Sequence, residues 1–242
     1  MEVLSHRANS LVSKYLNIRE KLMQLNYLSN NKLVDGVELD FNLSKDGKFV
    51  LSHSNYFCNK PLSYYNMDEL RKNGFISLED LLNVICDELK ILVDFKVPLN
   101  EETKKYYDSL FDVLKNSKNK ILLQSFKKNL IMYLLNKKDK ISNVDVGIVI
   151  NFFKSYGYNL SDLKDFKDVD FISLSSEHFE NNFMKKNYKY YRDIFPNASQ
   201  YAWIWSPPYI ETNKRYEKYI SCGVDGIITN YPEKVKKLSN RG

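Results

Sequence analysis

Two apolar stretches of the sequence contain charged residues two positions apart. Glu38 and Asp40 lie in the run Val37–Phe41, and Asp94 and Lys96 end the run that begins at residue 91. Residues i and i+2 of a strand point to the same face, so the members of each pair can project together. A carboxylate in an apolar run is costly to bury unless it is paired or bound to a cation. Three carboxylates with no matching cluster of arginines therefore predict a divalent-cation site, and oxygen-only ligands favour Mg²⁺ or Ca²⁺ over zinc.

A second interpretation of the same residues remains open at this point. Asp94 could pair with Lys96, and Glu38 with Arg7, as buried salt bridges that need no metal.

Two histidines, His6 and His53, are expected to lie near these charged residues. His6 ends a short apolar run at the N-terminus. His53 follows the run KFVLS at 48–52, which a turn-forming segment precedes. These residues predict a short extra strand that brings His53 to the place where His6 lies. Histidine titrates near neutral pH, so the two suit general acid and general base catalysis, although either one alone could be incidental. We expect His178 to be a loop residue.

Short runs rich in Val, Ile and Leu alternate with helical patterns along the whole chain. Strands that are apolar throughout and alternate with helices indicate a buried parallel sheet. Eight such units in 242 residues predict an α/β fold, a single-domain (β/α)₈ TIM barrel over residues 1–242, with a small excursion after the second strand. An open doubly wound sheet is the alternative, but no GxGxxG follows the first run.

The predicted strands are Val3–Ser5, Gly36–Leu43, Ile91–Phe95, Ile121–Gln124, Val146–Asn151, Asp170–Leu174, Tyr201–Trp205 and Val224–Thr229. The predicted helices include Leu11–Tyr27, Leu78–Leu89, Glu101–Lys115 and Phe179–Tyr191, and Ser77 is the expected N-cap of the second, with Asp80 completing a capping box.

Composition narrows the classes of function. The net charge is +6, but the lysines are scattered, so we expect no nucleic-acid partner. No apolar run approaches the roughly 18 residues that a membrane span needs. The start of the sequence lacks the pattern of a secretory signal. Three cysteines without CxxC spacing exclude a disulfide scaffold and a zinc ribbon, and a reducing, cytoplasmic location is expected.

Six motifs in order along the chain resemble the glycerophosphodiester phosphodiesterase family, within the superfamily of phospholipase-C-like phosphodiesterases. They are HR at 6–7, GVELDFNLSKDGKFVLSH at 36–53, SLEDLL at 77–82, VDFK at 93–96, QSF at 124–126 and GVDGIITNYPEKV at 223–235. The resemblance runs from His6 to Val235, and the motifs at 36–53 and 223–235 are the most specific.

The resemblance implies a (β/α)₈ barrel and an enzyme that hydrolyses a phosphodiester, a glycerophosphodiester or a related alcohol or sugar phosphodiester, to a phosphomonoester and an alcohol. It implies one divalent cation, Mg²⁺, Ca²⁺ or Mn²⁺, and a small-molecule or polysaccharide substrate. By matching position, the metal ligands are Glu38, Asp40 and Asp94, the acid/base pair is His6 and His53, and the substrate contacts are Arg7, Lys96 and Trp205, with Trp203 as the other candidate tryptophan. His6 would be the base and His53 the acid.

Several positions depart from the family's usual motifs. Asp94 stands where a glutamate is usual, Ser54 where an aspartate follows the second histidine, and Asn230 where an aspartate follows the last strand. Two other functions therefore stay open: a catalytically inactive barrel that binds a phosphorylated ligand, and a metal-independent lyase that forms a cyclic phosphate.

Overall fold

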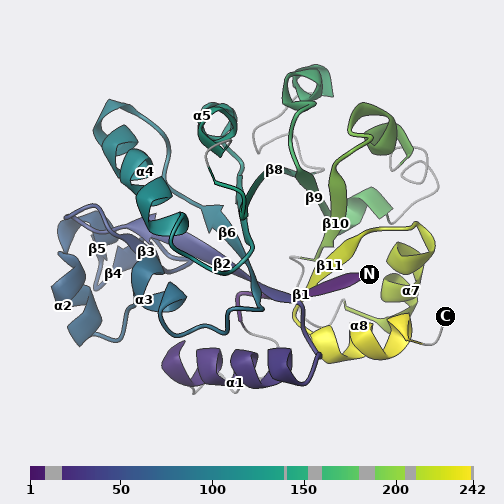
Figure 1. Ribbon diagram of the computed structural model, residues 1–242, viewed down its shortest axis with the longest axis horizontal. Helices are drawn as coiled ribbons and strands as arrows, with labels where there is room; N and C mark the ends of the chain where they lie inside the picture. Colours follow the sequence, from purple (N-terminus) through teal and green to yellow (C-terminus); the bar gives the residue numbers. More distant parts are fainter. Residues whose placement is uncertain (9–17, 139–140, 152–159, 180–188, 205–210, 241–242) are drawn as a thin grey trace.

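The eight apolar segments form a closed parallel barrel. The computed structural model describes residues 1–8, 18–138, 141–151, 160–179, 189–204 and 211–240. Strands pair in the order β1-β11-β10-β9-β8-β7-β6-β2, and β1 pairs with β2 to close the ring, which confirms the predicted fold. Figure 1 shows the strands at the centre and the helices outside them. The barrel strands are β1 (Glu2–His6), β2 (Gly36–Leu43), β6 (Lys90–Phe95), β7 (Ile121–Ser125), β8 (Val144–Ile150), β9 (Phe171–Ser175), β10 (Ser199–Trp203) and β11 (Gly226–Thr229).

Alternation along each strand separates two layers of the core. Val3, Ile91 and Val93 pack in the large cluster beneath the helices, whereas Leu4 and Leu92 belong to a compact cluster inside the barrel. The interior cluster takes residues from seven of the eight strands: Leu4, Leu92, Leu122, Val149, Phe171, Tyr201, Trp203 and Ile228. Residues two positions further along these strands therefore also face the interior, at the carboxyl end where TIM barrels place their sites.

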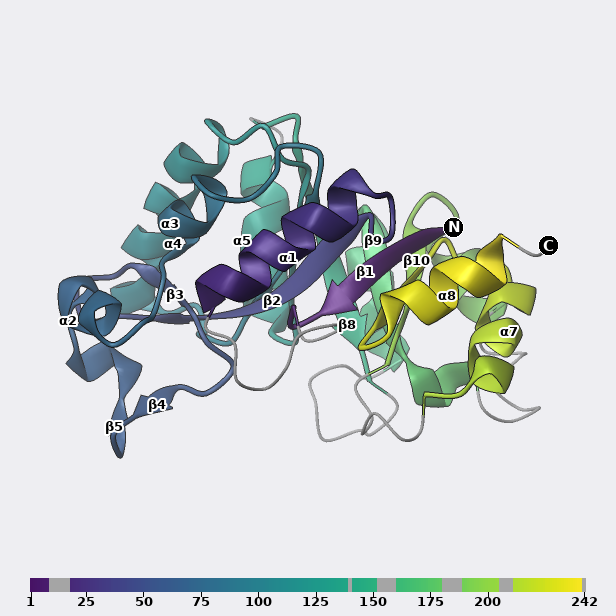
Figure 2. The ribbon, with the colours of Figure 1, turned by 90° about the horizontal axis from the view of Figure 1, so that it is seen from below.

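The excursion after the second strand is present and small. The strand β3 (Phe49–Leu51) pairs antiparallel with β2. A two-stranded hairpin, β4 (Tyr56–Phe57) with β5 (Lys60–Pro61), follows it and projects from the body in Figure 2. The 3₁₀ helix η1 (Leu62–Tyr64) and the helix α2 (Met67–Lys72) complete the segment. Val50, Leu62, Met67 and Leu70 form its own small buried core.

The outer layer follows the predicted alternation. Its elements are α1 (Ile18–Asn30), α3 (Leu78–Leu82), α4 (Glu101–Leu114), α5 (Lys128–Lys138), η2 (Leu160–Phe166), η3 (Ser176–Phe179), α7 (Asn213–Ser221) and α8 (Pro232–Ser239). The predicted helix 101–115 is confirmed as α4. Parts of the predicted helices 11–27 and 179–191 lie outside the described residues. None of the described helices has both the length and the apolar character needed to cross a membrane.

The predicted helix over 78–89 is too long, because α3 ends at Leu82. After Leu82, side-chain amides form hydrogen bonds with backbone groups that a longer helix would pair with one another. The Cys86 N–H donates to Asn26 Oδ1 at 2.8 Å, and the carbonyls of Cys86 and Leu89 accept from Asn119 Nδ2 at 2.7 and 2.8 Å. These tertiary hydrogen bonds satisfy the chain without a helix.

The start of α3 is capped as the sequence predicts. The Ser77 hydroxyl accepts from the Asp80 N–H at 3.1 Å, and the Asp80 carboxylate accepts from the Ser77 N–H at 2.9 Å. We expect Ser77→Ala to lower the free energy of unfolding by about 1 kcal/mol, the usual value of an N-cap, measured by urea denaturation. The matched control is Ser109→Ala, an exposed position inside α4 where alanine is the better helix former. An equal loss in both variants would contradict the capping role.

Candidate active site

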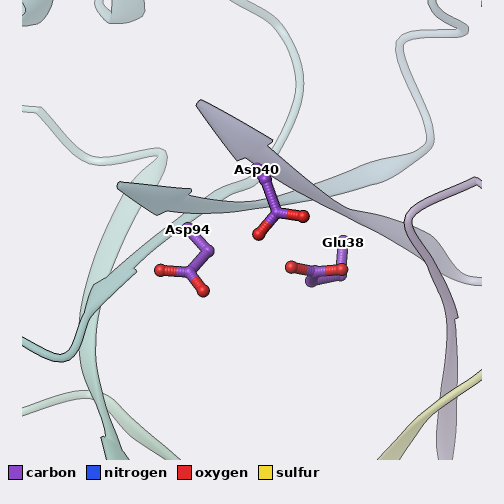
Figure 3. Close-up of side chains that lie close together, drawn as sticks. All are labelled: Glu38, Asp40 and Asp94. Atoms are coloured by element: carbon purple, nitrogen blue, oxygen red, sulfur yellow. The ribbon is translucent and has the colours of Figure 1, made fainter. Parts of the chain in front are cut away.

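Three carboxylates meet inside the barrel mouth because two strands run in register. Asp40 on β2 lies opposite Asp94 on β6, and Glu38 lies opposite His6 on β1. Each of these residues occupies an interior position of its strand. Figure 3 shows the carboxylates of Glu38, Asp40 and Asp94 turned toward one another.

The three carboxylates are close enough to share one ion. One oxygen from each lies within 4.8 Å of the others, and all three side chains are buried. Glu38 Oε1 and Asp94 Oδ1 have no hydrogen-bond partner among the described residues. Buried carboxylate oxygens are normally satisfied, so these two are free to coordinate a cation. An all-oxygen set of this kind fits Mg²⁺, Ca²⁺ or Mn²⁺.

Two basic side chains lie against the cluster. Lys96 Nζ lies 2.7 Å from Asp40 Oδ1 and 2.6 Å from Asp94 Oδ2. Arg7 Nε lies 3.1 Å from Asp40 Oδ2. The expected Asp94–Lys96 pair is therefore present, but the arginine side chain pairs with Asp40 and not with Glu38. Three acids against two bases leave one negative charge uncompensated when all are ionised.

Burial and the excess of negative charge together change the pKa values of the residues in the cluster. Burial raises the pKa of Glu38 well above its usual range, and the Asp40 and Asp94 charges raise it further. Burial raises the pKa of Asp94 to about 6, against the lowering effect of Lys96. Burial alone would lower the pKa of Lys96, but Asp94 and Asp40 raise it, so the ammonium stays charged. The unfavourable free energy of burying the cluster therefore appears as raised pKa values of the acids, and a bound cation would lower these pKa values again.

A left-handed turn after β1 places Arg7. Arg7 and Ala8 both have φ of 51°, an uncommon conformation for residues with a side chain. The turn aims the Arg7 N–H at Glu38 Oε2, 3.1 Å away, while the guanidinium group reaches Asp40. One residue thus contacts two of the carboxylates, and about a third of its side chain stays exposed toward the cavity.

His6 is buried, and its ring is hydrogen-bonded through Nδ1, whereas Nε2 has no hydrogen-bond partner among the described residues. Its Nδ1 lies 3.1 Å from Asn230 Oδ1, and its Nε2 lies 3.7 Å from Glu38 Oε2. The Asn230 oxygen can only accept, so Nδ1 carries the proton and the neutral ring presents the Nε2 lone pair beside the carboxylates. Burial first, and then the Arg7 charge, lower the pKa of His6 to about 4. A neutral ring with a directed lone pair can accept a proton.

His53 is exposed on the segment after β3 and lines a cavity at the barrel mouth. The cavity measures about 380 Å³, and its lining includes Arg7, Lys96, His53 and Trp203. Partial burial lowers the pKa of His53, the Asp40 charge raises it, and the Arg7 and Lys96 charges lower it. The extra strand therefore delivers His53 to the mouth as predicted. The Ser54 hydroxyl is hydrogen-bonded to the Tyr56 backbone and not to His53.

Asn42 holds this segment in place, and the sequence analysis did not select it. Its Nδ2 donates to the carbonyls of Ser52, at 2.7 Å, and Ser54, at 3.3 Å. Asn42 continues the interior positions of Glu38 and Asp40 along β2, and this continuation of the i, i+2 pattern is the signal that could have found it.

Of the two candidate tryptophans, Trp203 lines the cavity and Trp205 lies outside the described residues. The Trp203 ring meets His6 edge to face, with centroids 6.3 Å apart, and contacts Phe126, whose centroid is 5.8 Å away. These two aromatic rings form an apolar wall of the cavity. The third histidine, His178, is not a loop residue as expected, because it lies buried on η3, with Nδ1 3.3 Å from the Tyr191 hydroxyl.

The protonation of His6 can be measured directly. Because its pKa is lowered, we expect the ring of the metal-free protein to stay neutral as the pH falls below 6.5 and to become protonated near pH 4. The chemical shift of the ring proton on Cε1 would report the transition. Arg7→Met removes a charge that lowers the pKa and should move the midpoint upward. A midpoint at the usual value near 6.5 would contradict this account of His6.

Solved structures with low sequence identity share the fold of this chain. No family model matches the chain, and no curated protein sequence gives a significant match. A glycerophosphodiester phosphodiesterase from Thermotoga maritima is 22% identical, with a TM-score of 0.71, covering 98% of this chain and 97% of that one. One from Parabacteroides distasonis is 18% identical, with a TM-score of 0.75 and coverage of 99% and 97%. An Oleispira antarctica phosphodiesterase in complex with its product sn-glycerol-3-phosphate is 16% identical, with a TM-score of 0.72 and coverage of 99% and 97%. Over nearly its whole length, therefore, the chain has the fold of solved glycerophosphodiester phosphodiesterases.

Proposed function

We propose that the protein is a divergent glycerophosphodiester phosphodiesterase, a metal-dependent enzyme that hydrolyses a phosphodiester to a phosphomonoester and an alcohol. The observation that carries the proposal is the buried cluster of Glu38, Asp40 and Asp94, against which Arg7 and Lys96 lie. These two basic side chains also line a cavity together with His53. The shared fold supports it, as does the product found in the Oleispira protein. The substrate is a glycerophosphodiester or a related alcohol or sugar phosphodiester, of small-molecule or polysaccharide size.

The donor set fits one divalent cation. Glu38, Asp40 and Asp94 would hold it through carboxylate oxygens alone, so Mg²⁺, Ca²⁺ and Mn²⁺ are the candidates. A cation bound there would supply Lewis-acid polarisation of the phosphoryl group and neutralise charge on its oxygens.

Arg7 and Lys96 bind and orient the phosphate. Both line the cavity while their other contacts hold them against the carboxylates. Fixed cations of this kind stabilise the negative charge that develops on the phosphoryl oxygens in the transition state. Trp203 and Phe126 give the substrate an apolar surface on one side of the cavity.

The two histidines move the protons. His6 takes a proton at Nε2 from the attacking water, or from a neighbouring hydroxyl of the substrate. His53 gives a proton to the leaving alkoxide, so that a new P–O bond forms as the old one breaks and no free alkoxide is released. The assignment follows the family resemblance, and the neutral, oriented state of His6 supports it.

The remaining surface supports the other parts of the proposal. Among the described residues, several lysines pair with acids on other elements, as Lys118 does with Asp87 and Lys120 with Asp145, and we propose no nucleic-acid partner. The cysteines are unpaired, which fits a reducing cytoplasm. We propose that residues 1–242 form one catalytic domain that acts in lipid metabolism.

Chelation tests the metal. We expect EDTA to abolish hydrolysis of bis(p-nitrophenyl) phosphate and of glycerophosphodiesters, and Mg²⁺, Ca²⁺ or Mn²⁺ to restore it. Because the pKa values of Glu38 and Asp94 are raised, binding at pH 6 should release protons, measurable by calorimetry in buffers of different ionisation enthalpy. Asp94→Asn should weaken binding and release fewer protons. The matched control is Asp108→Asn, because Asp108 pairs with Lys137 on the surface.

Two outcomes would contradict the metal-dependent hydrolase. Activity that survives chelation and yields a cyclic phosphate would identify a lyase. A protein that binds the cation and a phosphate ligand but turns over no phosphodiester would be an inactive binding barrel.

Substrates with different leaving groups test the histidines. We expect His6→Ala and His53→Ala each to lower kcat by roughly 10²–10⁴-fold on a natural glycerophosphodiester. A p-nitrophenolate leaving group hardly needs protonation, so activity of the His53 variant should largely recover on that substrate while the His6 variant stays slow. Steady-state rates on both substrates give the comparison. Equal losses on both would contradict a divided acid/base pair.

A further inference from the structure

A buried carboxylate, Glu211, is linked to His6 by hydrogen bonds through Asn230. Glu211 is only 4% exposed and precedes the helix α7. It is not one of the residues that line the cavity, and the mechanism above does not use it. Its hydrogen bonds explain its position.

Among the described residues, Glu211 accepts hydrogen bonds from Tyr216, Thr229 and Asn230. Its Oε2 accepts from the Tyr216 hydroxyl at 2.6 Å, from the Thr229 hydroxyl, and from the Asn230 backbone N–H at 3.2 Å. Burial and the Glu211 charge both raise the pKa of Tyr216, so this hydroxyl keeps its proton and donates. The remaining oxygen, Oε1, accepts from Asn230 Nδ2.

That last hydrogen bond decides which way the Asn230 amide points. A carboxylate can only accept, so the NH₂ group of Asn230 must face Glu211. The amide oxygen then faces His6, where it lies 3.1 Å from Nδ1. An amide oxygen can only accept as well, so the His6 proton must be on Nδ1 and the lone pair on Nε2. Glu211 therefore determines the tautomer of His6 from two hydrogen bonds away.

We propose that Glu211 is a positioning residue that, through Asn230, fixes the tautomer and orientation of the His6 ring and keeps its Nε2 lone pair directed at the reacting phosphate. The inference rests on the proposed function for the meaning of that lone pair, but the tautomer itself does not depend on any activity. Asn230 suits this role because an aspartate there would set a second carboxylate against Glu211.

Two-bond ¹H–¹⁵N spectra of the metal-free, histidine-labelled protein test the inference. The chain has three histidines, and His6→Asn identifies the His6 signals. Wild type should show a protonated Nδ1 and a bare Nε2. Glu211→Ala and Asn230→Ala, which break the same chain at different places, should both shift the His6 population toward the tautomer with the proton on Nε2. Asn230→Ala removes only the amide group, so the hydrogen bonds from Tyr216 and Thr229 to Glu211 should remain.

Kinetics supply the second measurement. Both variants should lose about 10–100-fold in kcat, the usual cost of removing an orienting partner, with KM unchanged because neither residue lines the cavity. Glu211→Gln keeps an oxygen for the Asn230 amide and should retain more activity than Glu211→Ala. Tyr216→Phe is the matched control, because it removes a hydrogen bond to the same carboxylate and leaves the contact with Asn230 intact. It should keep the wild-type tautomer and kcat.

The outcomes separate this inference from the proposed function. An unchanged His6 tautomer in both alanine variants would overturn the positioning role, whatever the rates. A tautomer shift as large in Tyr216→Phe would also overturn it, since that result would mean general loosening. A tautomer shift specific to Glu211 and Asn230, in a protein that hydrolyses no phosphodiester, would support the positioning chain and remove the proposed function.

Discussion

Mutual repulsion among three buried carboxylates is the constraint on which the rest of the site depends. Glu38, Asp40 and Asp94 are taken out of water and brought within 4.8 Å of one another, and each property of the site responds to that cost. Lys96 and Arg7 lie against the cluster and offset part of the charge. The remainder raises the pKa values of Glu38 and Asp94, and two oxygens stay without a hydrogen-bond partner among the described residues. Burial of this kind is unfavourable for a fold and useful for holding a cation.

The closed barrel keeps the carboxylates together in spite of this repulsion. Each acid lies on a strand whose next outward-facing residue packs under the helices, as Leu39 and Val93 do. Shifting a strand by one residue would turn its acid into the apolar layer under the helices and its apolar neighbours into the barrel mouth. In-register pairing of Asp40 with Asp94 then fixes both at one level of the barrel. The apolar layers thus supply the free energy that holds the charged layer in place.

Local patterns in the sequence predict the site residues that follow the two-residue period of a strand. They predict few of the contacts that segments distant in the sequence make. The i, i+2 spacing identified Glu38, Asp40, Asp94 and Lys96, and the structure brings all four together. Whether Arg7 pairs with Asp40 or Glu38 is decided by the left-handed turn after β1, for which the sequence offers no glycine as a signal. Glu211 is 205 residues away from His6 in the sequence, and only the closure of the barrel between β11 and β1 brings its partner Asn230 to that ring. The end of α3 was missed for the same reason, since Asn26 and Asn119 act on it from other elements.

The surroundings of the two histidines differ in the way a divided proton transfer requires. His6 is buried, its ring is held through Nδ1, and its lowered pKa keeps it neutral, so it is ready to accept a proton but poorly placed to exchange one with solvent. His53 is exposed on a segment that Asn42 ties to β2, so it can regain a proton from water after each turnover. A base needs a fixed lone pair beside the attacking group, whereas an acid needs to be reprotonated and to lie where the alcohol departs. The excursion after β2 therefore sets the second histidine at the boundary between the cavity and the solvent.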